Sequence, residues 1–155
     1  MSDGQNLHAT TAVLGESGVL IRGASGAGKT ALALALVDQV RSSGAFARLV
    51  ADDRTLVTRQ GDRLVARPHP ALAGRAERRG LGIVAVEHEP ACVLGLVVDL
   101  VEGRPERHPA PDALRCAIAG VVLPRVALPA GPPSLDAIAL VRTALVRAAL
   151  PDMAP

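Results

Sequence analysis

The stretch that decides the fold is Val19–Thr30, which reads VLIRGASGAGKT. Its first part, Val19–Arg22, is apolar up to the final arginine and predicts a buried strand. The second part, Gly23–Thr30, matches the pattern G-x-x-x-x-G-K-[ST] in full. Strong helix formers follow over Lys29–Arg41, with leucines and valines at helical spacing. A strand, a glycine-rich loop and a helix in this order predict a phosphate-binding loop.

The chemistry of phosphate binding explains the residue types in this loop. Glycines let the backbone curl so that successive N–H groups point at phosphate oxygens, and the helix N-terminus adds a favourable dipole. Lys29 is expected to reach the β- and γ-phosphates of a nucleoside triphosphate, and the Thr30 hydroxyl to coordinate Mg²⁺. A glycine-rich turn that only caps a helix is disfavoured, because both flanking elements suit a nucleotide-binding loop. The predicted nucleotide-binding residues are Gly23, Ala24, Ser25, Gly26, Ala27, Gly28, Lys29 and Thr30.

Length and composition limit the remaining possibilities. The 155 residues predict a single domain over residues 1–155. One Phe, no Tyr or Trp, and a net charge of +2 argue against nucleic acid as a partner, because such binding usually needs stacking aromatics or a strong basic excess. Cys92 and Cys116 have no metal-ligand spacing and are expected to be small buried hydrophobes.

No targeting or membrane signal is found in the sequence. Residues 1–6 are polar and lack the apolar core of a signal peptide. The longest apolar stretch, Ala91–Leu100, is too short to span a bilayer. We therefore expect a cytoplasmic protein that does not contact a membrane.

The rest of the chain predicts an α/β domain with many short strands and few helices, without a regular alternation of the two. Ala71–Gly82 is expected to be irregular and Glu102–Pro111 to be an exposed loop. Ser134 is a suitable N-cap for a last helix that ends near Leu150. Other strands are expected at Thr11–Leu14, Ala47–Ala51, Thr55–Arg59, Arg63–Arg67, Ile83–Val86, Cys92–Val101 and Val121–Leu128, the last near an edge because of Pro124.

Two carboxylates, Asp52 and Asp53, directly follow the predicted strand Ala47–Ala51. A strand just after the P-loop helix often lies beside the P-loop strand, so its C-terminal end would open onto the phosphates. One carboxylate would orient Mg²⁺, directly or through water, and the other would accept a proton. The alternative is a carboxylate pair in a turn between two strands.

Two further features remain open on their residues alone. Glu77–Ile83 reads ERRGLGI, in which glycines permit close approach of the backbone to a ligand and arginine forks suit phosphate. The same composition also fits a solvated basic loop. His8 alone is an ordinary near-terminal histidine, and no pair of histidines has a convincing metal spacing.

Taken together and in order, these features resemble the C-terminal catalytic domain of HPr kinase/phosphorylase. His8, Gly23–Thr30, Leu49–Arg54 and Glu77–Ile83 are similar to the family's active-site histidine, P-loop, Asp-Asp segment and Glu-x-Arg-Gly-Leu-Gly-Ile signature. The resemblance covers nearly the whole chain. It implies a P-loop kinase-like α/β domain, related to phosphoenolpyruvate carboxykinase, with a mixed sheet and few helices. The chain resembles the short form of alphaproteobacteria, which lacks the family's N-terminal domain.

The resemblance also implies an activity. The chain would be an ATP- and Mg²⁺-dependent serine kinase that phosphorylates HPr, a phosphocarrier of the sugar phosphotransferase system, and would form homo-oligomers, hexamers in the family. The family also removes the phosphate by phosphorolysis. Here residues 131–134, GPPS, stand where longer members have Lys-x-Gly-Arg, so the sequence leaves the reverse reaction open. A small-molecule phosphotransferase and a non-catalytic ATP-sensing module are the alternative functions.

The resemblance assigns roles by position. Asp53 would be the catalytic base, and His8 would support the acceptor phosphate or the aspartate. Lys29 would bind the transferring phosphate. Arg79 would stabilise charge on the phosphates, and Arg107 is the best match to a further catalytic arginine of the family. Thr30 and Glu77 would hold Mg²⁺, together with Asp52.

Overall fold

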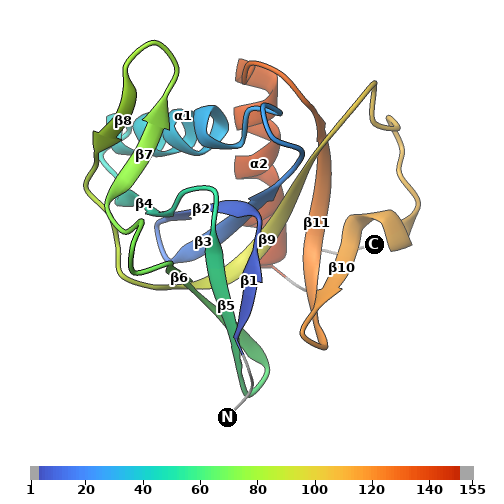
Figure 1. The fold of residues 1–155 in the computed structure, drawn as a ribbon. Helices are drawn as coiled ribbons and strands as arrows, with labels where there is room; N and C mark the ends of the chain where they lie inside the picture. The colour runs from blue at the N-terminus through green and yellow to red at the C-terminus, as the bar shows by residue number, and fades with distance from the viewer. Residues whose placement is uncertain (1–3, 151–155) are drawn as a thin grey trace.

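The glycine-rich loop joins strand β3 (Ser17–Arg22) to helix α1 (Lys29–Ser42) in a computed structural model that describes residues 4–150. Strand β2 (Ala9–Leu14) precedes β3 and forms an antiparallel hairpin with it. The hairpin closes through a tight turn in which Gly15 has a φ of +63°, a left-handed conformation that glycine adopts without strain. Figure 1 shows this hairpin at the centre of the molecule, below α1.

The other strands extend this hairpin into one large mixed sheet in the order β1-β5-β6-β9-β3-β2-β4. β9 is parallel to β3, and also to β11, which in turn pairs with β10. A separate two-stranded hairpin, β7–β8, rises beside α1 (Figure 1). The remaining elements are β1 (Gln5–Leu7), β4 (Ala47–Ala51), β5 (Thr55–Gln60), β6 (Arg63–Pro68), β7 (Arg75–Arg78), β8 (Gly82–Ala85), β9 (Cys92–Val101), the 3₁₀ helix η1 (Pro111–Leu114), β10 (Arg115–Ile118), β11 (Val121–Pro129) and α2 (Leu135–Ala148).

The position of β4 differs from the expected one. β4 lies beside β2 and not beside β3, because the tight hairpin places β2 in the position next to β3. β2 is antiparallel to both neighbours, so β3 and β4 run in the same direction. The C-terminal ends of β3 and β4 and the N-terminal end of β2 therefore meet at one edge of the sheet, where the functional residues gather.

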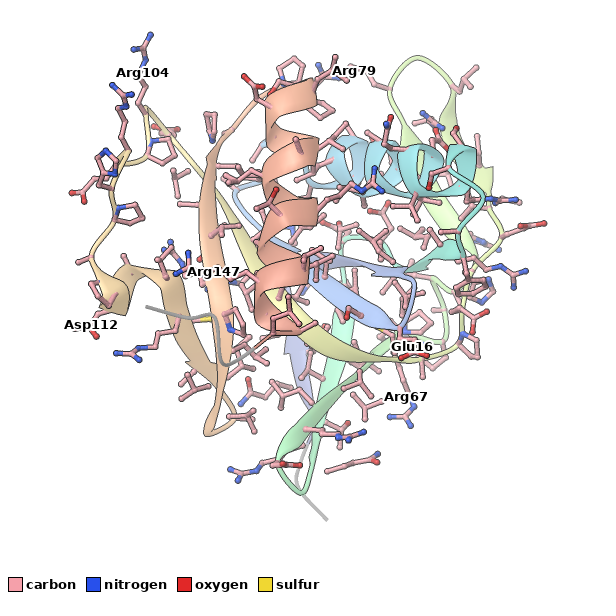
Figure 2. The ribbon with its side chains drawn as sticks, turned by 180° about the vertical axis from the view of Figure 1, so that it is seen from behind. Glu16, Arg67, Arg79, Arg104, Asp112 and Arg147 are labelled. Atoms are coloured by element: carbon pink, nitrogen blue, oxygen red, sulfur yellow. The ribbon has the colours of Figure 1, made fainter. Side chains whose placement is uncertain are left out.

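Two apolar cores lie on opposite faces of this sheet. On one face α1 and α2 cover Ala12, Ile21 and Val98. Figure 2, seen from behind, shows α2 lying across the strands on this face. On the other face Leu20 and Val97 pack with side chains from β5, β6, β10 and β11. Every residue of β2 is buried, because both of its faces are covered.

Most expected elements are confirmed, and the differences have physical reasons. β4 and β9 have the expected bounds, and the Ser134 hydroxyl caps α2 by accepting a hydrogen bond from Ala137 N at 3.0 Å. The stretch expected to be irregular, Ala71–Gly82, contains β7, which is mostly exposed and therefore shows no burial pattern, whereas β8 lies within one residue of the strand expected at Ile83–Val86. β1, β10 and η1 were also not expected. In β11, Pro124 lies where the pairing passes from β10 to β9.

Both cysteines are free thiols, and Cys92 agrees with the expected role as a small buried hydrophobe, whereas Cys116 is only partly buried. Cys92 is buried, and burial together with the negative charge of Glu89 raises the pKa of its thiol to about 12. Cys116 is half-buried, and burial likewise raises its pKa. Within residues 4–150 neither helix has the length and apolar character needed to cross a membrane.

A charged cluster supports the start of the glycine-rich loop. Asp99 on β9 accepts hydrogen bonds from Arg22 Nε at 2.7 Å and from Arg22 Nη2 at 2.8 Å, and a further one from Arg125 Nε. Burial alone would raise the pKa of Asp99, but the hydrogen bonds from the two guanidinium groups outweigh it and hold that pKa below its ordinary value. Since Arg22 immediately precedes Gly23, this cluster joins β9 and β11 to the loop.

We expect Asp99→Asn to lower the free energy of unfolding by about 2 kcal/mol at neutral pH, because two partly buried guanidinium groups lose their counter-charge. The folded-state pKa of Asp99 is depressed, so its contribution is present above the ordinary aspartate value of 3.8 and is lost as the pH falls through the folded pKa. Urea unfolding at pH 7 measures the loss of stability, and urea unfolding at pH values below 3.8 tests whether the contribution of Asp99 disappears.

Asp112→Asn is the matched control. The Asp112 side chain is 93% exposed where it pairs with Arg115, so its loss should change the free energy of unfolding little. An Asp99→Asn protein as stable as the wild type at pH 7 would contradict the role given to the cluster.

Candidate functional site

The glycine-rich loop has the backbone geometry of a phosphate cradle. Gly26 and Gly28 have φ values of +80° and +102°, in the left-handed region. A Cβ atom built on Gly28 would lie 2.5 Å from the carbonyl oxygen of Gly131. Gly131 N in turn donates a hydrogen bond to Ala27 O at 2.9 Å. The segment after β11 therefore packs directly against the loop, and only glycine fits at position 28.

Lys29 and Thr30 begin helix α1 at the end of this loop. Lys29 is buried, and its ammonium group donates to Gly23 O at 2.9 Å and to Ala24 O at 3.0 Å. A phosphate in the loop would therefore find the cation already at its rim. The first N–H groups of α1 have no partners within the helix and point toward the same place.

The Asp52 carboxylate connects three elements at this edge of the sheet. Its Oδ1 atom accepts hydrogen bonds from Thr30 Oγ1 at 2.6 Å and from Thr10 Oγ1 at 3.1 Å. Its Oδ2 atom accepts one from Glu77 N at 3.0 Å. Asp52 thus holds the start of α1, the start of β2 and strand β7 together.

Asp53 lies next to this carboxylate in an unusual backbone conformation. Its φ of +63° is left-handed, which aspartate tolerates better than most residues. Its Oδ1 atom lies 2.7 Å from His8 Nε2. The Asp53 side chain is 59% exposed and the His8 side chain 40% exposed. The Asp53–His8 pair is thus open to an approaching substrate.

These residues fit a nucleotide and a divalent cation. The glycine curve, the Lys29 ammonium group and the N-terminus of α1 suit a polyphosphate. Thr30 donates its proton to Asp52, which leaves the hydroxyl lone pairs free for a hard cation such as Mg²⁺. Within residues 4–150 no three His, Cys, Asp or Glu side chains form a cluster, so a cation here would depend on substrate oxygens and water as well.

The structure brings some of the predicted site residues together and leaves others apart. His8, Thr30, Asp52 and Asp53 form the hydrogen-bonded group described above, and Glu77 joins it through its backbone. Arg79 lies exposed in the β7–β8 turn, near the top of Figure 2. Arg107 lies exposed between β9 and η1. In the described part of the chain neither arginine has a hydrogen-bond or ion-pair partner, so their roles stay predictions.

Sequence reasoning did not identify two residues that take part in the site. Thr10 binds both aspartates, and its signal was a pair of polar residues, Thr10 and Thr11, in an otherwise apolar strand. Gly131 touches the P-loop, and no local pattern indicates that contact, which joins segments about a hundred residues apart.

Comparisons with known proteins agree with this geometry. The family model described as the HPr serine kinase C-terminal domain matches residues 1–105. The HPr kinase/phosphorylase of Mycoplasma mycoides is 31% identical over 137 residues, which cover 79% of this chain and 41% of that protein. The protein of the same name from Neisseria meningitidis serogroup C is 39% identical over 99 residues, which cover 59% of this chain and 29% of that protein. The chain thus spans less than half the length of these relatives.

A solved structure has the same fold. The Hpr(Ser) kinase/phosphatase from Coxiella burnetii superposes with a TM-score of 0.69 at 29% sequence identity. The superposition covers 96% of this chain and 92% of that one. The mixed α/β architecture, with its mixed sheet and few helices, is therefore confirmed.

We expect Asp52→Asn to reduce the effect of Mg²⁺ on ATP affinity by about tenfold, because the neutral amide no longer attracts the cation or orients the Thr30 hydroxyl. Calorimetric titrations with ATP, in the presence and in the absence of Mg²⁺, measure the two affinities. Asp38→Asn, on the exposed side of α1, is the control and should leave both titrations unchanged. Equal Mg²⁺ effects in the Asp52→Asn and wild-type proteins would remove Asp52 from the cation site.

Proposed function

This chain belongs to the family of the HPr serine kinase C-terminal domain, and from that premise we propose that it is a kinase that transfers the γ-phosphoryl group of ATP to a serine of an HPr-like phosphocarrier. The observation that carries the proposal is the arrangement of Asp53 beside His8, at the edge of the sheet where the glycine-rich loop and Asp52 also lie. A phosphate cradle and an exposed carboxylate at one edge are the two parts that such a transfer needs.

The proposed step is an in-line displacement. The seryl oxygen forms a bond to the γ-phosphorus of ATP while the bond from that phosphorus to the bridging oxygen of ADP breaks. Asp53 takes the proton of the seryl hydroxyl, and His8 holds the carboxylate at 2.7 Å in position to receive it. ADP leaves with the electron pair of the broken bond.

The loop residues neutralise charge during this step. Lys29 exchanges its contacts with the Gly23 and Ala24 carbonyls for the phosphates. Thr30 and Asp52, with Glu77 from the hairpin, would hold Mg²⁺, which neutralises charge on the phosphate oxygens when it is bound. The exposed Arg79 would stabilise further charge on the phosphates, and Arg107 is the best match to a further catalytic arginine of the family.

The site geometry also separates this proposal from its alternatives. An ATP-sensing module needs the loop and Asp52, but it does not need an exposed carboxylate held by a histidine. A small-molecule phosphotransferase would need arginines already directed at its acceptor, whereas Arg79 and Arg107 have no partner in the described residues. We therefore favour a protein acceptor that supplies its own contacts.

The first experiment incubates the purified chain with ATP, Mg²⁺ and HPr from the same organism and measures the intact mass of HPr. We expect a gain of one phosphate, absent when the acceptor serine of HPr is replaced by alanine. No gain despite measured ATP binding would overturn the proposal in favour of the sensing module or another acceptor. Adding inorganic phosphate to phosphorylated HPr and assaying pyrophosphate tests the reverse reaction separately.

We expect Asp53→Asn to lower the transfer rate by at least about a hundredfold, because the amide cannot take the seryl proton. ATP affinity should stay within about twofold of wild type, since Asp53 does not line the glycine-rich loop. Single-turnover transfer and ATP titration measure the two quantities. Asp62→Asn, in the exposed β5–β6 turn, is the matched control. Normal serine phosphorylation by the Asp53→Asn protein would refute the assigned role.

A further inference from the structure

Three consecutive residues, His8 just before β2 and the first two residues of that strand, each contact a different group of Asp53. His8 Nε2 lies 2.7 Å from the Asp53 carboxylate. Ala9 N donates a hydrogen bond to Asp53 O at 3.1 Å. Asp53 N donates one to Thr10 Oγ1, also at 3.1 Å. The side chain, the carbonyl and the amide of Asp53 are therefore all bound by one short segment.

Thr10 differs from the other two residues because its hydroxyl binds both aspartates at once. It accepts from the Asp53 amide and donates its single proton to Asp52 Oδ1. Thr10 is fully buried on the α1 side of β2, where an unpaired hydroxyl would be costly. Both of its hydrogen bonds end on residues of the proposed site.

Loss of the Thr10 hydroxyl would affect different groups of the two aspartates: the Asp53 amide would lose its hydrogen-bond partner, although Asp53 keeps its contacts with His8 and Ala9 N. Asp52 is also held by Thr30 Oγ1 and by Glu77 N, so it keeps two hydrogen bonds if the Thr10 hydroxyl is removed. The left-handed φ of +63° at Asp53 costs free energy that local contacts must offset. The Thr10 hydroxyl is the partner of the Asp53 amide in that conformation.

We propose that Thr10 is a positioning residue for phosphoryl transfer, whose hydroxyl holds the Asp53 backbone so that its carboxylate faces the acceptor. The proposal rests on the proposed function for its kinetic readout but not for its structural one. It predicts that loss of the hydroxyl changes the turnover of the site and not its affinity for ATP, because the contacts of Asp52 and the glycine-rich loop remain.

The chain offers a conservative set of variants to test this role. Thr10→Val keeps the shape of the side chain and removes the hydroxyl, whereas Thr10→Ser keeps the hydroxyl. Thr11→Val is the matched control, because Thr11 is equally buried on the next position of β2. Its hydroxyl pairs with Thr55 Oγ1 at 2.9 Å and makes no hydrogen bond to either aspartate among the described residues.

The first measurement is the rate of amide hydrogen exchange at Asp53, measured by NMR on the whole chain. We expect Thr10→Val to speed this exchange by about three- to tenfold, the effect of losing one hydrogen bond. Thr10→Ser and Thr11→Val should stay within about twofold of wild type. Exchange in Thr10→Val as slow as in the wild type would overturn the proposal, and so would equal acceleration by Thr11→Val.

The second measurement is steady-state transfer from ATP to HPr by the same variants. We expect kcat to fall by about three- to tenfold in Thr10→Val, with KM for ATP unchanged, and Thr10→Ser to restore kcat. A rise in KM at unchanged kcat would overturn the positioning role. If the wild type phosphorylates no HPr, the proposed function fails, while the exchange measurement still decides whether Thr10 holds Asp53.

Discussion

The arrangement of the site depends on the Asp52 carboxylate, which accepts hydrogen bonds from three separate elements. Thr30 donates from the start of α1, Thr10 from β2, and the Glu77 amide from β7. A partly buried carboxylate needs such donors, because its charge is costly without them. The same requirement fixes the distance between the glycine-rich loop and the hairpin that carries the Glu77–Ile83 segment. A divalent cation bound beside Thr30 would also draw on this charge.

The hairpin formed by β2 and β3 determines which residues lie around Asp52 and Asp53. Its tight turn places β2 between the loop strand and β4, so the start of β2 lies at the same edge as the ends of β3 and β4. Residues from three parts of the chain thereby meet around Asp53. A doubly wound sheet with β4 directly beside β3 would bring the two aspartates to the loop without His8 and Thr10.

Two sets of contacts away from the aspartates also support the glycine-rich loop, and neither takes part in the proposed transfer. Asp99 binds Arg22 at the entry to the loop and Arg125 on β11. Gly131, just beyond β11, approaches Gly28 so closely that no side chain fits at position 28. β11 therefore links the charged cluster to the segment that packs on the loop. These contacts hold the cradle from outside the phosphate site, and a loop already shaped for phosphate would bind it at a lower entropic cost.

The sequence by itself determined the loop Gly23–Thr30, the helix that follows, the strands before Asp52 and at Cys92–Val101, and the family resemblance, because each depends on residues close together in the chain. Only the tertiary structure decided that Thr10 binds both aspartates, that β2 separates β3 from β4, and that Gly131 packs on Gly28. Strand β7 and its pairing with β8 also escaped prediction, since the mostly exposed β7 carries no alternation of buried and exposed residues. Local patterns report periodicity and turn chemistry, whereas strand order and contacts between distant segments arise from how the whole chain buries its apolar faces.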